Sequence, residues 1–281
     1  MKQILLLFIG FTAFILANIN TVVSILPEQT FVKAIGGEKV KVTLMVTPGN
    51  SPHTYEPKPS QMKAVAKAQL YFAIGVEFEK RWLPQFKDLN PTMKIVDLST
   101  GIEKMPMAAH HHEEEHHKAS GLDPHIWTAP KNVAHMAQRI FDALVLADPQ
   151  NSDYYKANLD AFLAKIKETD TRIKTYLSPL PKGTAFMVFH PSWGYFAKAY
   201  GLRQLPIEIE GKNPKPRELI SVIKAAKKAH VRAIFTQPEF SDASAKIIAD
   251  ELHIPVIKVS PLTPDWSENL VRIAKAIAGV Q

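Results

Sequence analysis

Residues 149–177, PQNSDYYKANLDAFLAKIKETDTRIKTYL, decide how this chain divides. The stretch has no glycine, and no proline after its first residue. Its apolar residues recur at helical spacing, at Leu159, Phe162, Leu163, Ile166 and Ile173. A helix of this length would reach roughly 43 Å, more than one small lobe needs, so we expect it to join two lobes. The alternative is two helices with a break near residues 169–171.

Short β-rich runs alternate with amphipathic segments on both sides of this stretch. Strands are predicted at 21–26, 40–46, 70–75, 94–98, 185–190, 204–209, 233–237 and 256–259. Helices are predicted at 27–35, 60–68, 216–229 and 241–252, with Ser60 as the N-cap of the second. This alternation predicts parallel sheets with helices on both faces. We therefore expect an α/β fold of two lobes, each with a mostly parallel sheet, joined by one long rigid helix.

The composition excludes several classes of protein. At 281 residues, 46% hydrophobic and 22% charged, the chain can bury substantial cores, which excludes disordered and collagen-like chains. The formal charge of +7 is spread along the sequence, so nucleic-acid binding is not indicated. The absence of cysteine rules out disulfide scaffolds, thiolate zinc sites and cysteine nucleophiles.

The first 17 residues have the pattern of an export signal. Lys2 precedes an apolar run from Ile4 to Leu16, and Ala17 offers a small residue for cleavage. The alternative, a membrane anchor, would need about 18 to 20 apolar residues, more than this run has. We therefore divide the chain into a signal peptide (1–17), an N-terminal lobe (18–148), a linking helix (149–177) and a C-terminal lobe (178–281).

Three histidines occupy similar local settings. His53, His125 and His190 each lie next to proline in a predicted connection between elements. Ligands of open α/β sheets gather at the carboxyl ends of the strands, so we expect these histidines to meet there. Three imidazoles suit Zn²⁺ better than Mg²⁺, Ca²⁺ or Mn²⁺. The histidines in or beside predicted helices are expected to be structural or solvated: His135, His230 and His253.

The segment 110–118, HHHEEEHHK, is of low complexity. Such a segment cannot build a core, and we expect a surface loop that attracts metal weakly. Its auxiliary ligands would be His110, His111, His112, His116 and His117. His112, Glu113 and His116 also match the HExxH pattern of zinc proteases. No apolar face is present on which such a helix could pack, so we interpret the match as compositional.

Four motifs carry a family resemblance: PHTYEPKPS with His53, DPHIW with His125, FHPSWGYFAKAYGL with His190, and QPEFSDASAKIIADEL. With them the chain resembles the periplasmic zinc and manganese receptors of ABC transporters, solute-binding proteins with two lobes joined by a rigid helix. The resemblance covers essentially the whole mature chain. It implies that His53 and His125 are ligands. The third ligand position is His in many zinc receptors and Glu in manganese receptors, and His190 stands there.

The fourth ligand is where the chain departs from this pattern. Family members commonly supply a carboxylate from the loop after the last strand, or leave water there. Ser260 stands where many zinc receptors have Asp, and Pro52 holds the place of a carboxylate that some receptors have before the first histidine. Asp265 and Glu239 are the candidates that remain, and the sequence leaves the choice open.

The resemblance implies a function outside the cytoplasmic membrane. We expect a periplasmic monomer that binds Zn²⁺, with Mn²⁺ less favoured, and delivers it to the permease and ATPase of an ABC importer. Binding should depend on pH, because protonated histidine cannot ligate. One alternative is a zinc hydrolase or lyase with three histidines and an activated water, although no base motif lies outside the His-rich segment. Another is a metal-dependent adhesin or a zinc buffer.

Deletion of residues 110–117 should leave the tightest zinc-binding step intact and lower the total zinc bound per chain. Ordering an unpacked segment around an ion costs conformational entropy, so metal held there should be weaker. Equilibrium titration with a competing chelator measures both quantities. Loss of the tightest step would show that the segment supplies a primary ligand.

Overall fold

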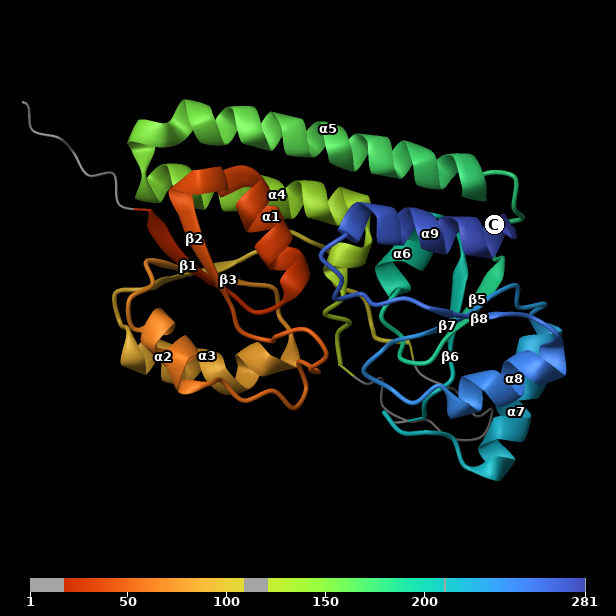
Figure 1. Ribbon diagram of the computed structural model, residues 1–281. Coiled ribbons are helices and arrows are strands. Elements are labelled where there is room, and N and C mark those ends of the chain that lie inside the picture. Colours follow the sequence, from red (N-terminus) through yellow and green to blue (C-terminus); the bar gives the residue numbers. More distant parts are fainter. Residues whose placement is uncertain (1–17, 109–120, 210, 281) are drawn as a thin grey trace, which may run out of the picture.

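The computed structural model describes residues 18–108, 121–209 and 211–280, and it has two lobes side by side with one long helix across both (Figure 1). The N-terminal sheet has the order β2-β1-β3-β4 and the C-terminal sheet the order β6-β5-β7-β8. Every strand pair is parallel. The predicted two-lobed α/β fold is therefore confirmed. The predicted signal sequence and the His-rich segment lie outside the described residues.

All eight predicted strands are present, with shorter bounds. They are β1 (Ile19–Val23), β2 (Val40–Leu44), β3 (Leu70–Ala73), β4 (Lys94–Asp97), β5 (Ala185–Val188), β6 (Arg203–Pro206), β7 (Ile234–Thr236) and β8 (Val256–Lys258). The inner strands β3, β5 and β7 are buried at every position, as expected for strands covered on both faces. Most predicted strands run too far at the carboxyl end, because their last residues already belong to the loops that line the cleft.

The helices cover both faces of the sheets. The N-terminal lobe has α1 (Leu26–Gly36), α2 (Pro59–Val65), α3 (Glu77–Leu89) and α4 (Pro130–Ala147); the C-terminal lobe has α6 (Gly194–Ala199), α7 (Pro216–Lys228), α8 (Ala243–Leu252) and α9 (Trp266–Ala278). The prediction of Ser60 as an N-cap was wrong. Lys58 is the N-cap of α2, because Pro59 has the fixed φ and missing N–H that suit the first helical position.

Helix α5 (Ser152–Leu177) is one unbroken helix of 26 residues, roughly 39 Å long. It begins after a 3₁₀ turn at Pro149–Asn151. Thr169, where a break was the alternative, is buried, and its hydroxyl lies 2.8 Å from the Lys165 carbonyl and 2.6 Å from the Ser267 hydroxyl. The Thr169 hydroxyl thus has hydrogen-bond partners while the helix continues without a break. In the described ranges no helix is both long and apolar enough to cross a membrane.

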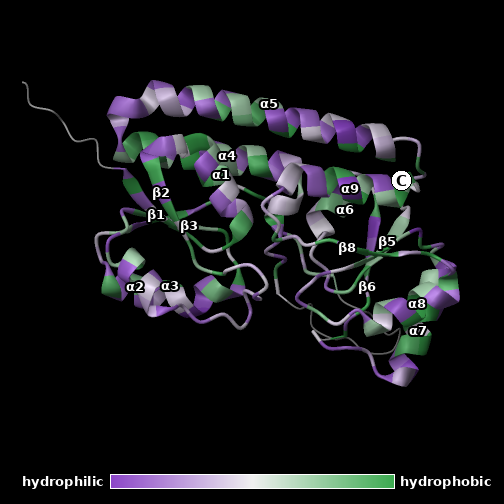
Figure 2. Ribbon diagram, in the orientation of Figure 1, coloured by the Kyte–Doolittle hydropathy of each residue, from purple (hydrophilic) through white to green (hydrophobic). Residues whose placement is uncertain are grey.

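The hydrophobic core is continuous between the lobes. One cluster extends from the N-terminal sheet beneath α5 to Phe186 and Phe235 of the C-terminal sheet and to α9. A second cluster lies between the outer face of the C-terminal sheet and helices α7 and α8. In Figure 2, α5 alternates purple and green along its length, as expected for a helix with one buried stripe. The shared core holds the two sheets in a defined relation.

Two carboxyl groups are buried at the carboxyl ends of β1 and β3. Glu28 is fully buried, and Glu79 is 3% exposed. Burial raises the pKa of Glu79 to about 7, although hydrogen bonds from Ser24 and from the backbone amides of Ile74 and Gly75 lower it. Burial and the nearby charge of Glu79 raise the pKa of Glu28 well above its ordinary value. The N-terminal lobe therefore folds around carboxyl groups that retain protons in mildly acidic solution.

Replacement Glu79→Gln should flatten the pH dependence of stability. The unfolded carboxyl titrates near 4.5 and the folded one near 7, so the folded chain holds more protons between these values. Stability from this group is complete below the unfolded pKa and is lost as the pH rises through the folded pKa. Urea unfolding of metal-free protein from pH 5 to 8 measures the free energy of unfolding of both proteins. As the pH rises, this free energy should fall for the parent relative to the variant. The exposed Glu103→Gln serves as control, and a pH-independent difference for Glu79→Gln would contradict the assignment.

Candidate metal centre

The three predicted histidines meet in a cleft between the lobes. His53 lies in the loop after β2, His125 immediately precedes the 3₁₀ turn Ile126–Thr128, and His190 lies two residues after β5. All three line one pocket of about 470 Å³, together with residues of the loops after β3 and β7. The ring centres of His125 and His190 are 5.3 Å apart, and those of His53 and His190 are 5.6 Å apart. The expected convergence at the carboxyl ends of the strands is thus present.

These ring separations fit a shared metal ion. Zinc binds imidazole nitrogen at about 2.0 to 2.1 Å, so two imidazoles of one tetrahedral zinc have ring centres roughly 5 Å apart. Among the described residues, no three His, Asp or Glu side chains already stand in position to hold an ion. The two ring separations are nevertheless close to the spacing that a shared zinc requires.

Each of the three rings faces a carboxylate through Nδ1. The pairs are His53 with Glu77 (3.2 Å), His125 with Asp123 (2.7 Å) and His190 with Glu208 (2.9 Å). A carboxylate that accepts the Nδ1 proton fixes the tautomer and leaves Nε2 as the free ligand atom. Within the described part of the chain, Nε2 of His190 is buried and has no hydrogen-bond partner. Such an orphaned nitrogen is expected where a metal ion completes the site.

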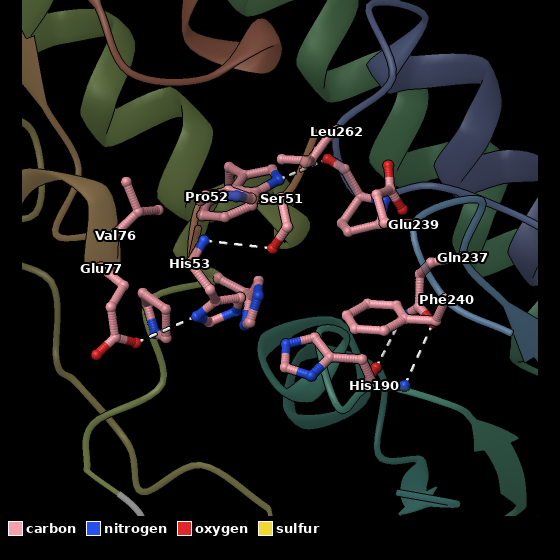
Figure 3. A pocket seen from close by; sticks show the side chains of 14 residues that line it. Ser51, Pro52, His53, Val76, Glu77, His190, Gln237, Glu239, Phe240 and Leu262 are labelled. Carbon is pink, nitrogen blue, oxygen red and sulfur yellow. Dashed lines mark hydrogen bonds and ion pairs between the residues drawn. The ribbon is translucent and has the colours of Figure 1, made fainter. Parts of the chain in front are cut away.

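The three histidines differ in burial. His125 and His190 are 7% and 8% exposed, whereas the His53 side chain is 40% exposed. The Phe240 ring stacks on His190 at 5.3 Å between ring centres. Figure 3 shows His53 beside Glu77 on one side of the pocket, with His190 and Phe240 on the other. Two ligand candidates are therefore buried, and the third lies at the mouth.

Of the two candidates for a fourth ligand, Glu239 lines the pocket. Its Oε1 accepts a hydrogen bond from the Ser260 hydroxyl at 3.3 Å. Asp265 is the N-cap of α9 and is not among the lining residues. Pro52, which takes the place of a carboxylate before the first histidine, also lines the pocket. The geometry therefore favours Glu239 over Asp265.

The partners Glu77, Asp123 and Glu208 were not predicted from the sequence. Asp123 had a signal, since it precedes His125 by two residues in the DPHIW motif. Glu77 begins α3 and Glu208 follows β6, so each meets its histidine only through the fold. The three other described histidines lie outside the pocket lining: His135 contacts the Thr100 carbonyl at 2.8 Å, and His230 and His253 have positive φ angles after α7 and α8.

Comparison with known families places the chain. The protein-family model of the periplasmic zinc-uptake complex component A (ZnuA) matches residues 21–279. The chain belongs to this family. A ZnuA crystal structure is 41% identical to it, with a TM-score of 0.84, covering 94% of this chain and 99% of that one.

Curated relatives include proteins named for either metal. The high-affinity zinc uptake system protein ZnuA of Bacillus subtilis is 29% identical to this chain, over 84% of the chain and 76% of the relative. The manganese-binding lipoprotein MntA of Halalkalibacterium halodurans is 27% identical, over 79% of the chain and 72% of the relative. Membership of the ZnuA family therefore indicates a divalent metal. Which metal is bound must be inferred from the donor atoms of the site.

Replacement Glu208→Gln should weaken zinc binding by about 10- to 100-fold, because a carboxylate partner orients the ligand imidazole and raises its basicity. Competition titration against a chelator of known affinity measures the change. Glu103→Gln is the matched control, since the Glu103 side chain is 84% exposed and pairs only with Lys198 among the described residues. Equal zinc affinity of Glu208→Gln and parent would show that Glu208 does not support a ligand.

Proposed function

We propose that the chain captures Zn²⁺ outside the cytoplasmic membrane and delivers it to an ABC importer. His53, His125 and His190 are the proposed protein ligands. The observation that carries the proposal is that three imidazoles from separate loops face one pocket, each with a carboxylate at Nδ1. This is the arrangement expected of neutral histidines that present Nε2 to a metal. Membership of a zinc-uptake family supports transport rather than catalysis.

The donor atoms favour zinc over manganese. Manganese prefers carboxylate, carbonyl and water oxygen, whereas imidazole suits zinc. The pocket offers three imidazoles, and Glu239 is the carboxylate in its lining that we propose as a fourth ligand. A relative named for manganese binding makes a direct comparison of the two metals necessary. We propose Zn²⁺ as the cargo and Mn²⁺ as a weaker competitor.

The cellular setting completes the proposal. Residues 1–17 act as an export signal, and the mature chain is a periplasmic monomer that meets a permease and its ATPase. Residues 18–148 and 178–281 form the two metal-binding lobes, with 149–177 as the linking helix. The core shared beneath α5 supports small lobe movements rather than wide closure. The His-rich segment, residues 110–118, is proposed as an auxiliary metal-gathering tract.

The single variants His53→Ala, His125→Ala and His190→Ala should each bind zinc more weakly than the parent. The loss should exceed the roughly 10- to 100-fold that removal of an outer partner costs, because a direct ligand is lost. Competition titration with Zn²⁺ and Mn²⁺, on protein purified without chelator, measures affinity, stoichiometry and metal preference. The parent should bind one tight zinc per cleft and prefer it over manganese.

His135→Ala is the matched control, since this ring contacts the Thr100 carbonyl away from the pocket lining. Unfolding curves of the metal-free variants separate loss of a ligand from loss of the fold. Two results would contradict the proposal: parent-like zinc affinity in all three cleft variants, or equal affinity of the parent for manganese and zinc.

A further inference from the structure

The stretch that carries His125 belongs to the N-terminal lobe by sequence but is hydrogen-bonded to the C-terminal lobe. Its three bonds across the boundary are Tyr195 hydroxyl to Asp123 carbonyl (2.9 Å), Trp127 indole to Pro261 carbonyl (2.8 Å) and Trp266 indole to Trp127 carbonyl (2.7 Å). All three bonds are buried. Buried hydrogen bonds are costly to break, because each broken bond leaves a polar group without a partner.

The first turn of α6 packs directly against the carboxylate that orients His125. Asp123 Oδ1 accepts from the His125 backbone amide at 2.9 Å and lies 2.7 Å from its Nδ1. The other oxygen, Oδ2, packs on Gly194, where an added Cβ would lie only 2.7 Å from it. The neighbouring Tyr195 hydroxyl accepts a hydrogen bond from the Met105 amide at 3.2 Å. Gly194 and Tyr195 thus determine where Asp123 and His125 sit.

His53 has no comparable attachment. Its backbone amide bonds to Ser51, its ring to Glu77, and nearby Tyr55 to Gln61, all within the N-terminal lobe. In the part of the chain that the structure describes, no hydrogen bond joins residues 51–56 to the C-terminal lobe. The three buried bonds that attach the His125 stretch to the C-terminal lobe therefore oppose a displacement of His125 relative to His190, and no such bond opposes a displacement of His53 in the described residues.

We propose that His125 and His190 form a preassembled pair carried by the C-terminal lobe, with Gly194 and Tyr195 as the positioning residues of His125. The proposal rests on the proposed function. The pair takes the incoming ion first, and His53 joins last and leaves first. When the site opens, His53 therefore separates from His125 and His190, although His53 and His125 belong to the same lobe by sequence. Release to the permease then requires the loss of one exposed ligand rather than the separation of three.

A double-mutant cycle on zinc affinity tests the positioning role. Tyr195→Phe removes a hydroxyl that bonds both the Asp123 carbonyl and the Met105 amide. It should weaken zinc binding at least roughly fivefold, the typical effect of one hydrogen bond. Because Tyr195 acts through His125, its effect should vanish in the His125→Ala background. The effect should remain roughly fivefold in the His53→Ala background, since uncoupled sites add. Tyr200→Phe is the control: its hydroxyl, at the end of the same helix, lies 2.8 Å from Asp170 on α5.

Two further measurements extend the test. Gly194→Ala should weaken zinc binding more than Tyr195→Phe, because its Cβ displaces Asp123, and metal-free unfolding curves check that both variants fold. In stopped-flow mixing, His53→Ala should release zinc faster than the parent while capturing it at a rate within about twofold of the parent's, as expected when one interaction changes mainly the off-rate.

A fivefold effect of Tyr195→Phe that persists without His125, or a greater loss of affinity in His53→Ala than in His125→Ala, would overturn the preassembled pair. Parent-like affinity of Tyr195→Phe would overturn it as well. These outcomes leave the proposed function standing, provided that each cleft histidine still contributes to zinc binding. Parent-like binding by all the histidine variants would overturn the proposed function and the pair together.

Discussion

The hydrogen bond between histidine Nδ1 and a carboxylate organises the cleft. Such a bond fixes the imidazole tautomer, so Nε2 becomes the atom offered to a metal. The bonds at His125 and His190 are 2.7 and 2.9 Å long, and both are buried. The Asp123 oxygen that faces His125 Nδ1 also accepts a hydrogen bond from the His125 backbone amide at 2.9 Å. The orientation of these imidazoles thus depends on their carboxylate partners.

The second constraint is the relation between the two sheets. Parallel strands with helical crossovers place all their carboxyl-end loops along one edge of the sheet, and ligands gather at that edge. Loops from both sheets line the pocket, and the core continues between the lobes beneath α5 and through α9. Figure 1 shows α5 lying across both lobes. The hydroxyl pair of Thr169 and Ser267, 2.6 Å apart, joins these two helices in the same layer. A continuous core of this kind resists wide opening of the two lobes.

The lobe to which each cleft histidine is attached does not follow from its position in the sequence. By sequence, His53 and His125 share a lobe. The Trp127 indole, however, donates to the Pro261 carbonyl, and the Trp127 carbonyl accepts from the Trp266 indole, so the His125 stretch is attached to the C-terminal lobe. The exposed His53 has no such attachment in the described residues, and its contact with Glu77 is the longest of the three carboxylate pairs. A receptor that must bind tightly and still release its ion benefits from one ligand that is held less firmly than the others.

The sequence by itself determined the local features. The alternation of apolar runs located all eight strands, and the uninterrupted helical spacing of residues 149–177 predicted α5, because both signals depend only on neighbours along the chain. The motifs around His53, His125 and His190 identified the rings that meet. Only the tertiary structure paired Glu77 and Glu208 with their histidines and brought Glu239 rather than Asp265 to the pocket. These contacts join separate elements, so their distances depend on how the two lobes pack, which no local pattern records.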